Sequence, residues 1–304
     1  MRPWLPSLAV LALLAAAPFL LPAYHSTNLA RIMVLATFAM GYNLAFGMTG
    51  LLSLGHALFF AAGLYAAGLA ITQLSLPATL ALPAGLAAGA LTAALTGLLA
   101  LRTTGTAFMI VTLMFAQAGY LAILYFGDIT RGDEGFTLPR AARALGPLDL
   151  SQDAPRYALA FTLFALGLLA SLALTRSPTG RILTAVRENP ERTRMLGYDP
   201  FRYRLLALTL SGLYAGGAGA AYALLFGYVG ATFASVQYSI LPLLWVLLGG
   251  AGTILGPLLG TALMFYVIDQ ASRVTDATLL VVGAALILLV LFAPRGLLGT
   301  LRWR

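Results

Sequence analysis

Residues that could do chemistry gather between Gly47 and His56. Ser53 and His56 stand three positions apart, a spacing that could pair a serine nucleophile with a histidine base. No carboxylate is positioned beside them to orient the histidine, and glycine-rich packing explains the same segment without a reaction. His56 also lies in an apolar run, where a buried polar side chain needs a hydrogen-bond partner. We therefore expect no catalytic residue here, and His56 is first of all a packing residue.

The composition excludes most other kinds of catalytic and cofactor site. All 18 basic residues are arginine, and the chain has no cysteine. Without lysine there can be no phosphate-binding loop of the G-x-x-x-x-G-K-[ST] type, and without cysteine there is no disulfide or thiolate metal site. The only two histidines, His25 and His56, are too far apart for an H-E-x-x-H zinc site. We expect a protein that is not an enzyme and that holds no metal or cofactor.

The elements that carry these residues are membrane helices. Of the 304 residues, 60% are apolar and 9% are charged, whereas charged residues make up roughly 25% of an average soluble protein. We predict an all-α, polytopic transmembrane bundle of about eight to ten spans, with helices that are interrupted by glycine, in one domain that covers residues 1–304. The apolar runs cover residues 5–23, 29–46, 51–73, 77–101, 106–127, 156–175, 205–228, 239–250, 254–272 and 277–293.

Two of these runs have lengths that leave alternatives open. The run 5–23 could be a signal peptide, but it is long enough to span a bilayer, so we expect a retained first helix. The run 239–250 is too short for an ordinary span. It could form a half-helix or a re-entrant segment, or it could join its neighbour.

Clustered glycines interrupt the apolar pattern at two places. Glycine in a span leaves backbone groups that protein or water must satisfy, and interrupted helices in two parts of a chain point to a transport path. Close helix packing is the alternative, because small residues let helices approach. We predict that the residues of the two clusters form the translocation path or break the helices: Gly47, Gly50, Ser53, Gly55 and His56 in the first, and Gly249, Gly250 and Gly252 in the second.

Two long polar loops predict the orientation. Loop 128–155 carries three arginines against five acidic residues, and loop 176–204 carries seven arginines against three. Because arginine gathers in cytoplasmic loops, we place 176–204 in the cytoplasm, 128–155 outside, and both termini in the cytoplasm. The same rule explains the net charge of +8 without nucleic acid as a partner.

The loop 176–204 has the pattern of a docking segment. Ser177 or Thr179 could cap the start of a helix, and Gly197 could end it. Apolar residues alternate with charges between these positions, which favours a short amphipathic helix. Such a helix could lie along the membrane or insert into a groove on a partner protein.

The run from Ala185 to Gly197 resembles the coupling loop of bacterial ABC-importer permeases, and most closely that of the branched-chain amino-acid permease family of the LivM type. Glu191 and Gly197 keep the spacing of the coupling pattern, although Arg192 and Thr193 replace its two alanines. The other stretches that resemble the family are 50–60, 130–135, 247–257 and 294–299.

The resemblance implies a transmembrane permease subunit of an ATP-driven importer in the bacterial cytoplasmic (inner) membrane. Its partners would be a homologous permease, two ABC ATPase subunits, an extracytoplasmic solute-binding protein and the lipid bilayer. The residues that it implies for ATPase coupling are Arg187, Glu188, Glu191, Arg192, Leu196 and Gly197.

The expected solutes are branched-chain amino acids, but similar permeases carry urea, other amino acids or aromatic acids. A secondary transporter driven by an ion gradient is the other class of hypothesis. It would need intramembrane carboxylates as ion sites, and Asp269 is the one acidic residue within a proposed span.

Overall fold

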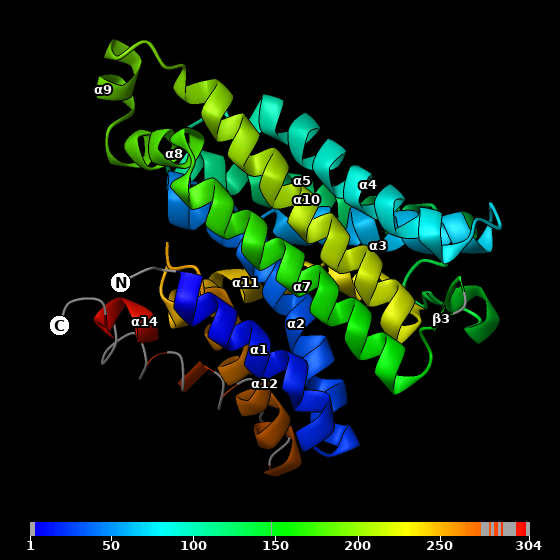
Figure 1. The fold of residues 1–304 in the computed structure, drawn as a ribbon. Coiled ribbons are helices and arrows are strands. Elements are labelled where there is room, and N and C mark those ends of the chain that lie inside the picture. Colours follow the sequence, from blue (N-terminus) through cyan, green and yellow to red (C-terminus); the bar gives the residue numbers. More distant parts are fainter. Residues whose placement is uncertain are drawn as a thin grey trace.

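A computed structural model describes residues 4–146, 148–274, 280, 283–284, 287 and 296–301. The chain folds into a bundle of long helices, joined at one end by short helices and at the other by small strands (Figure 1). The long helices are α1(Trp4–Leu20), α2(Ala23–Asn43), α3(His56–Thr72), α4(Ala78–Ala100), α5(Thr106–Tyr125), α7(Asp153–Arg176), α10(Pro200–Phe226), α11(Val236–Gly249) and α12(Gly256–Val274). The shorter helices are η1(Leu44–Met48), α6(Gly127–Thr130), η2(Arg140–Arg143), α8(Pro178–Glu188), α9(Pro190–Met195), η3(Ala231–Ala234) and α14(Gly296–Leu301).

The predicted helical membrane bundle is confirmed. Five helical segments are long and apolar enough to cross a membrane, and α1, α3 and α11 are shorter apolar helices. The short run 239–250 is a 14-residue helix of its own, α11, which a turn separates from α12. The predicted run 277–293 lies almost entirely outside the described residues. The five segments are Ala23–Met48, Ala78–Ala100, Thr106–Tyr125, Asp153–Arg176 and Pro200–Phe226.

Helix α10 lies at the centre of the bundle, against α2, α3 and α4. It can approach α3 and α4 closely because glycines face each other where the helices cross. A methyl group added at Gly63 would lie 2.1 Å from the carbonyl oxygen of Gly216, and one added at Gly89 would lie 2.4 Å from that of Gly212. Glycine is therefore needed at these crossings for packing.

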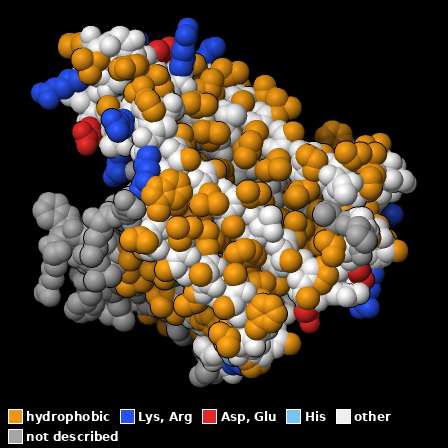
Figure 2. All heavy atoms as spheres, viewed as in Figure 1, with side chains coloured by type: hydrophobic (Ala, Val, Ile, Leu, Met, Phe, Trp, Pro, Cys, Tyr) orange, Lys and Arg blue, Asp and Glu red, His pale blue; other side chains and the backbone are white. Residues whose placement is uncertain are grey.

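The two polar loops lie at opposite ends of the bundle, because the 24-residue helix α7 runs from one to the other (Figure 1). We call the end that carries α8 and α9 the basic end. Blue arginine side chains gather there in Figure 2. The start of α1 lies at this end too, since the guanidinium of Arg176 stands 4.7 Å from the ring centroid of Trp4.

The strands lie at the end opposite the basic end. β1(Phe136–Thr137) pairs antiparallel with β4(Tyr228–Val229), with Phe136 opposite Val229. β2(Ala144–Leu145) pairs antiparallel with β3(Leu148–Asp149). The first pair joins the loop after α5 to the end of α10, so this end is tied to the central helix.

Candidate functional site

The two glycine-rich breaks, residues 47–55 and 249–256, contact each other at the basic end. The buried side chain of Asn43, at the end of α2, joins them. Its Nδ2 donates to the carbonyl oxygen of Thr253 at 2.9 Å, and its Oδ1 accepts from the backbone N–H of Gly252 at 2.8 Å. One amide thus pairs with a backbone acceptor and a backbone donor more than 200 positions away. We call this arrangement the Asn43 clasp.

Because Gly47 has no side chain, there is room beside it for the Asn43 clasp. It lies in the π-helical turn η1, a geometry that is frequent at functional sites. A methyl group at Gly47 would lie 2.1 Å from Oδ1 of Asn43 and 2.6 Å from the nitrogen of Gly252. Any side chain at this position would therefore push the two breaks apart.

The second break is a tight turn between α11 and α12. A methyl group at Gly249 would lie 1.8 Å from the carbonyl oxygen of Gly256, and Gly250 has a φ of +111°. Thr253 closes the turn, because its hydroxyl donates to the carbonyl of Gly250 at 2.6 Å and accepts from the N–H of Gly256 at 3.1 Å. The start of α14 also packs here, since a methyl group at Gly296 would lie 2.4 Å from the nitrogen of Gly250.

His56, at the start of α3, pairs with Ser211 and not with Ser53, which lies three positions before it in the sequence. Its Nε2 lies 2.7 Å from the hydroxyl of Ser211 on α10, and its ring contacts Tyr42 edge-on at 4.6 Å between centroids. The hydroxyl of Ser53 instead accepts from the N–H of Gly55 at 3.2 Å. His56 is fully buried and joins α3 to α10.

Thr112 of α5 holds the loop between η1 and α3. Its hydroxyl accepts from the backbone N–H of Leu54 at 3.1 Å. Gly55 allows the contact, because a methyl group there would lie 2.6 Å from the carbonyl oxygen of Thr112. Among the residues that the structure describes, no group of three or more His, Asp or Glu side chains could hold a metal ion.

The basic loop forms two helices where the sequence predicted one, and that prediction is wrong. The hydroxyl of Ser177 caps α8 by accepting from the N–H of Gly180 at 3.1 Å. Asn189 then adopts an extended conformation, with φ −155° and ψ 98°, because Pro190 disfavours a helical residue before it. The side chain of Asn189 caps α9 by accepting from the N–H of Arg192 at 2.9 Å. Gly197, with φ +88°, follows the end of α9, as expected.

Arg187 connects this loop to the first break. Its Nη1 donates a hydrogen bond to the carbonyl oxygen of Gly47. Carbonyls at the end of a helix lack partners within the helix, and a cation there is favourable. The same side chain flanks both breaks: a methyl group at Gly50 would lie 3.3 Å from its Cγ, and one at Gly252 would lie 3.5 Å from its Nη1.

Helix α9 is exposed at the tip of the basic end. Met195 and Leu196 are 85% and 74% exposed, which is unusual for apolar side chains outside the bundle wall. The predicted coupling residues Glu188, Glu191, Arg192 and Gly197 are exposed beside them. The arrangement is an apolar tip within a charged rim, and it can fit a groove on another protein.

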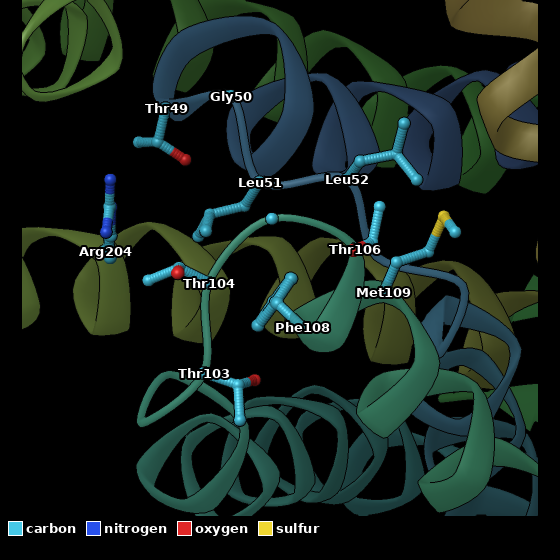
Figure 3. Close-up of a pocket in the computed structure, with 11 residues that line it drawn as sticks. Thr49, Gly50, Leu51, Leu52, Thr103, Thr104, Thr106, Phe108, Met109 and Arg204 are labelled. Carbon is cyan, nitrogen blue, oxygen red and sulfur yellow. The ribbon is translucent and has the colours of Figure 1, made fainter.

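A cavity of about 300 Å³ opens beside the first break (Figure 3). The loop 49–52 lines one side of it, the loop 103–106 lines another, and Arg204 of α10 stands at its edge. A second hollow of about 170 Å³, lined by Pro190 and Glu191, shares Arg204 as a wall. Arg204 therefore lies between α9 and the first break.

The loop at the other end is held by its own hydrogen bonds. The hydroxyl of Thr130 donates to the carbonyl of Ile123 at 2.6 Å. The backbone N–H and the hydroxyl of Ser151 both donate to the carboxylate of Asp149, each at 2.8 Å. These two bonds, helped by the nearby Arg143 and Arg140, hold the pKa of Asp149 below its ordinary value.

Sequence reasoning missed two polar residues within the predicted run 29–46. Asn43 forms the clasp, and Arg31 is a part-buried arginine in the same helix. A signal was present, because a charged or amide side chain in an apolar run is costly unless it has a partner or a function.

Comparison with known proteins extends over nearly the whole chain. Residues 25–291 match the family described as the permease component of branched-chain amino acid transport systems. The high-affinity branched-chain amino acid transport system permease protein LivM of Escherichia coli K12 is 30% identical, over 97% of this chain and 74% of its own length. LivM of Salmonella typhimurium is 28% identical, over 97% of this chain and 75% of its own. The autoinducer 2 import system permease protein LsrC of Klebsiella pneumoniae is 36% identical over 34% of this chain and 31% of its own. No solved structure matches the chain.

Proposed function

The chain belongs to the family of branched-chain amino acid transport permeases, and from this premise we propose that it is the transmembrane subunit of an ATP-driven importer of branched-chain amino acids. It would work with a homologous permease, two ABC ATPase subunits and a solute-binding protein. We place the basic end in the bacterial cytoplasm and the β1–β4 end outside, following the excess of arginine in loop 176–204.

The observation that carries the coupling part of this proposal is the contact between Arg187 and Gly47. It gives α8 and α9 a direct physical connection to both glycine-rich breaks, because Gly47 lies against Gly252 and the Asn43 clasp. Coupling needs a contiguous network that can take two arrangements. The proposed coupling surface and the two glycine-rich breaks therefore belong to one connected structure.

In this mechanism ATP-driven closure of the ATPase subunits moves the exposed tip Met195–Leu196 and, with it, α9 and α8. Arg187 transmits the movement to η1, and the clasp transmits it to the turn between α11 and α12. The breaks lack regular helical hydrogen bonding, so they are where α2 and α11 can bend with least cost. The result is a gate at the cytoplasmic end of the path, opened and closed from the basic loop.

The described helices offer no ion site of the kind that a secondary transporter needs. Within them, the carboxylate that lies deepest in an apolar helix is that of Asp269, near the end of α12. It is already paired with Arg273 at 3.2 Å and accepts from the hydroxyl of Tyr24 at 2.7 Å. This supports an external energy source over ion coupling.

The test is leucine uptake into proteoliposomes that hold this chain, its homologous permease and the ATPase subunits. We expect uptake that requires both ATP and the loaded binding protein. Uptake by this chain alone, indifferent to ATP, would overturn the proposal. ATP hydrolysis stimulated by a binding protein loaded with another solute, without leucine uptake, would contradict the assigned solute only.

The docking surface has a separate test with a matched control. Leu196→Asp puts a charge into the exposed tip, and Leu74→Asp puts the same charge at a similarly exposed leucine, 68% accessible, beyond the end of α3. We expect the first variant to lose the ATPase subunits on copurification and the second to retain them. If both variants retained the ATPase subunits equally, α9 would not be part of the docking surface.

A further inference from the structure

Arg31 is a charged residue inside a membrane helix, and it has no role in the proposed coupling mechanism. It is the ninth residue of α2, and its Nε is buried without a hydrogen-bond partner. The salt bridges among the described residues are Arg156–Asp153, Arg202–Asp199 and Arg273–Asp269, so no described carboxylate neutralises Arg31. A charge at such a depth is costly and is by default a candidate functional residue.

An aromatic ring, and no described acid, lies against this arginine. The guanidinium carbon lies 4.7 Å from the ring centroid of Phe226, at the end of α10. From Phe226 the rings continue inward: Tyr222 at 4.7 Å, then Phe233 at 5.0 Å, then Tyr238 at 5.2 Å between successive centroids. We call these four residues the aromatic cluster. It brings together α10, η3 and α11 beside Arg31 of α2.

The cluster is partly exposed and lies beside a buried core. Arg31 and all four rings keep part of their surface exposed, although they lie where four elements converge. The next rings inward, Phe38 and Phe60, are fully buried, and Trp245 is 4% exposed. Asn43 follows on α2, about 18 Å below Arg31 at 1.5 Å per residue. The partly exposed cluster thus adjoins a buried core, which extends along α2 toward the clasp at the proposed gate.

We propose that Arg31 and the aromatic cluster bind the solute on its way through the path, with Arg31 binding its carboxylate. This inference rests on the proposed function and deepens it. A guanidinium offers paired donors that match a carboxylate, and aromatic faces attract an ammonium group and accept an aliphatic side chain. An amino acid zwitterion with an apolar side chain has these three features. Until the solute arrives, the ring of Phe226 partly compensates the arginine charge.

The experiment uses the whole transporter in proteoliposomes, with radiolabelled leucine and the binding protein. Uptake and ATP hydrolysis are measured separately, so that the leucine moved per ATP is the readout. The variants are Arg31→Gln and Arg31→Lys. Arg273→Gln is the control, because it removes an arginine near the same end that already has an acidic partner.

We expect Arg31→Gln to lower the leucine moved per ATP by about tenfold, the effect of losing a hydrogen bond to a charged group. Stimulation of ATP hydrolysis by the loaded binding protein should stay close to wild type, since docking and coupling are intact. Arg273→Gln should match wild type in both readouts. Arg31→Lys keeps the charge and loses the paired donors, so its ratio should lie between those of Arg31→Gln and wild type.

Two outcomes would overturn the inference. An unchanged ratio in Arg31→Gln would show that its charge is not used in transport. A parallel fall of uptake and ATP hydrolysis, with the ratio kept, would make Arg31 a packing residue that holds α2 to α10. If the transporter does not assemble with Arg31→Gln, the leucine moved per ATP by the Arg31→Lys transporter tests the inference in the same way. Failure of the wild type to take up leucine with ATP would instead be a failure of the proposed function, which separates the two.

Discussion

The guanidinium of Arg187 donates a hydrogen bond to the carbonyl oxygen of Gly47, 140 positions earlier in the chain. The donor lies near the end of α8, and the acceptor lies in the π-helical turn that follows α2. Since Gly47 also packs against Gly252, the basic loop and both glycine-rich breaks meet around one side chain. A residue of the predicted coupling set and one of the predicted path set are therefore in direct contact.

Arg187→Gln should uncouple ATP hydrolysis from uptake. Glutamine is shorter and uncharged, so it cannot reach the carbonyl of Gly47 with the same bond, and movement of α8 would reach η1 less completely. We expect leucine uptake per ATP to fall by about tenfold, the range for one hydrogen bond from a charged group. Arg181→Gln, at an exposed position on the same helix, is the control and should behave as wild type. An equal fall of leucine uptake per ATP in both variants would show that the effect comes from the total charge of the loop and not from the contact with Gly47.

Asn43→Ala and Asn43→Asp should both destabilise the protein. Alanine leaves the buried carbonyl of Thr253 and the part-buried N–H of Gly252 unpaired, and the lost partner of the buried carbonyl costs about 1–3 kcal/mol. Aspartate keeps an acceptor for Gly252 but places a carboxylate oxygen, with no proton to donate, against the carbonyl oxygen of Thr253. Thermal unfolding in detergent, followed by intrinsic fluorescence, measures the loss of stability. The clasp would be refuted as a stabilising contact if both variants unfolded at the wild-type temperature.

Gly249→Ala should disrupt the turn between α11 and α12. The added methyl group would lie 1.8 Å from the carbonyl oxygen of Gly256, which belongs to the backbone and cannot rotate away. Overpacking of this kind costs about 1–3 kcal/mol or more. Gly127→Ala is the matched control, because the nearest heavy atom there would be 4.0 Å away. The same unfolding assay should show a clear loss for the first variant and little change for the second, and the opposite order would contradict the packing described here.

How much of the fold and of the candidate site could be predicted from the sequence depends on how far apart in the chain the interacting residues lie. The apolar runs predict the helices well, because a membrane span is a local property of about 20 residues. Caps at Ser177 and a break at Gly197 are local too, and both lie where the pattern indicates. The break at Asn189 was missed because the helix caps and the apolar residues between them favoured one continuous helix over the rule for residues before proline.

The site itself depends on contacts that no local pattern contains. The pairing of His56 with Ser211, rather than with Ser53, is decided by how α3 crosses α10. The clasp between Asn43 and Gly252 spans 209 positions, and neither residue reveals the other in the sequence. The glycine clusters could be recognised as breaks, but their contact required the folded arrangement.

The loop that carries Asp149 should lose stability in acid. Its pKa lies below the ordinary value of 3.8, first because the backbone N–H of Ser151 bonds to the carboxylate and next because the Ser151 hydroxyl does. A depressed pKa means that the ionised form is favoured in the folded loop. Its stabilising effect is therefore complete above pH of about 4 and is lost as the pH falls through the folded value.

Hydrogen exchange of the segment 144–152 measures the stability of the loop at each pH. The readout is the protection factor of the backbone amide of residue 151. In the wild type the protection should be constant from pH of about 7 down to about 4 and should decline below that. Asp149→Asn removes the titrating group, so its protection should be lower at neutral pH and should not change across the acid range. Ser151→Ala removes one of the two donors, and its decline should begin at a higher pH than in the wild type, because the pKa is then less depressed. A wild-type protection factor that stayed constant to pH of about 2 would show that the loop is held without this carboxylate.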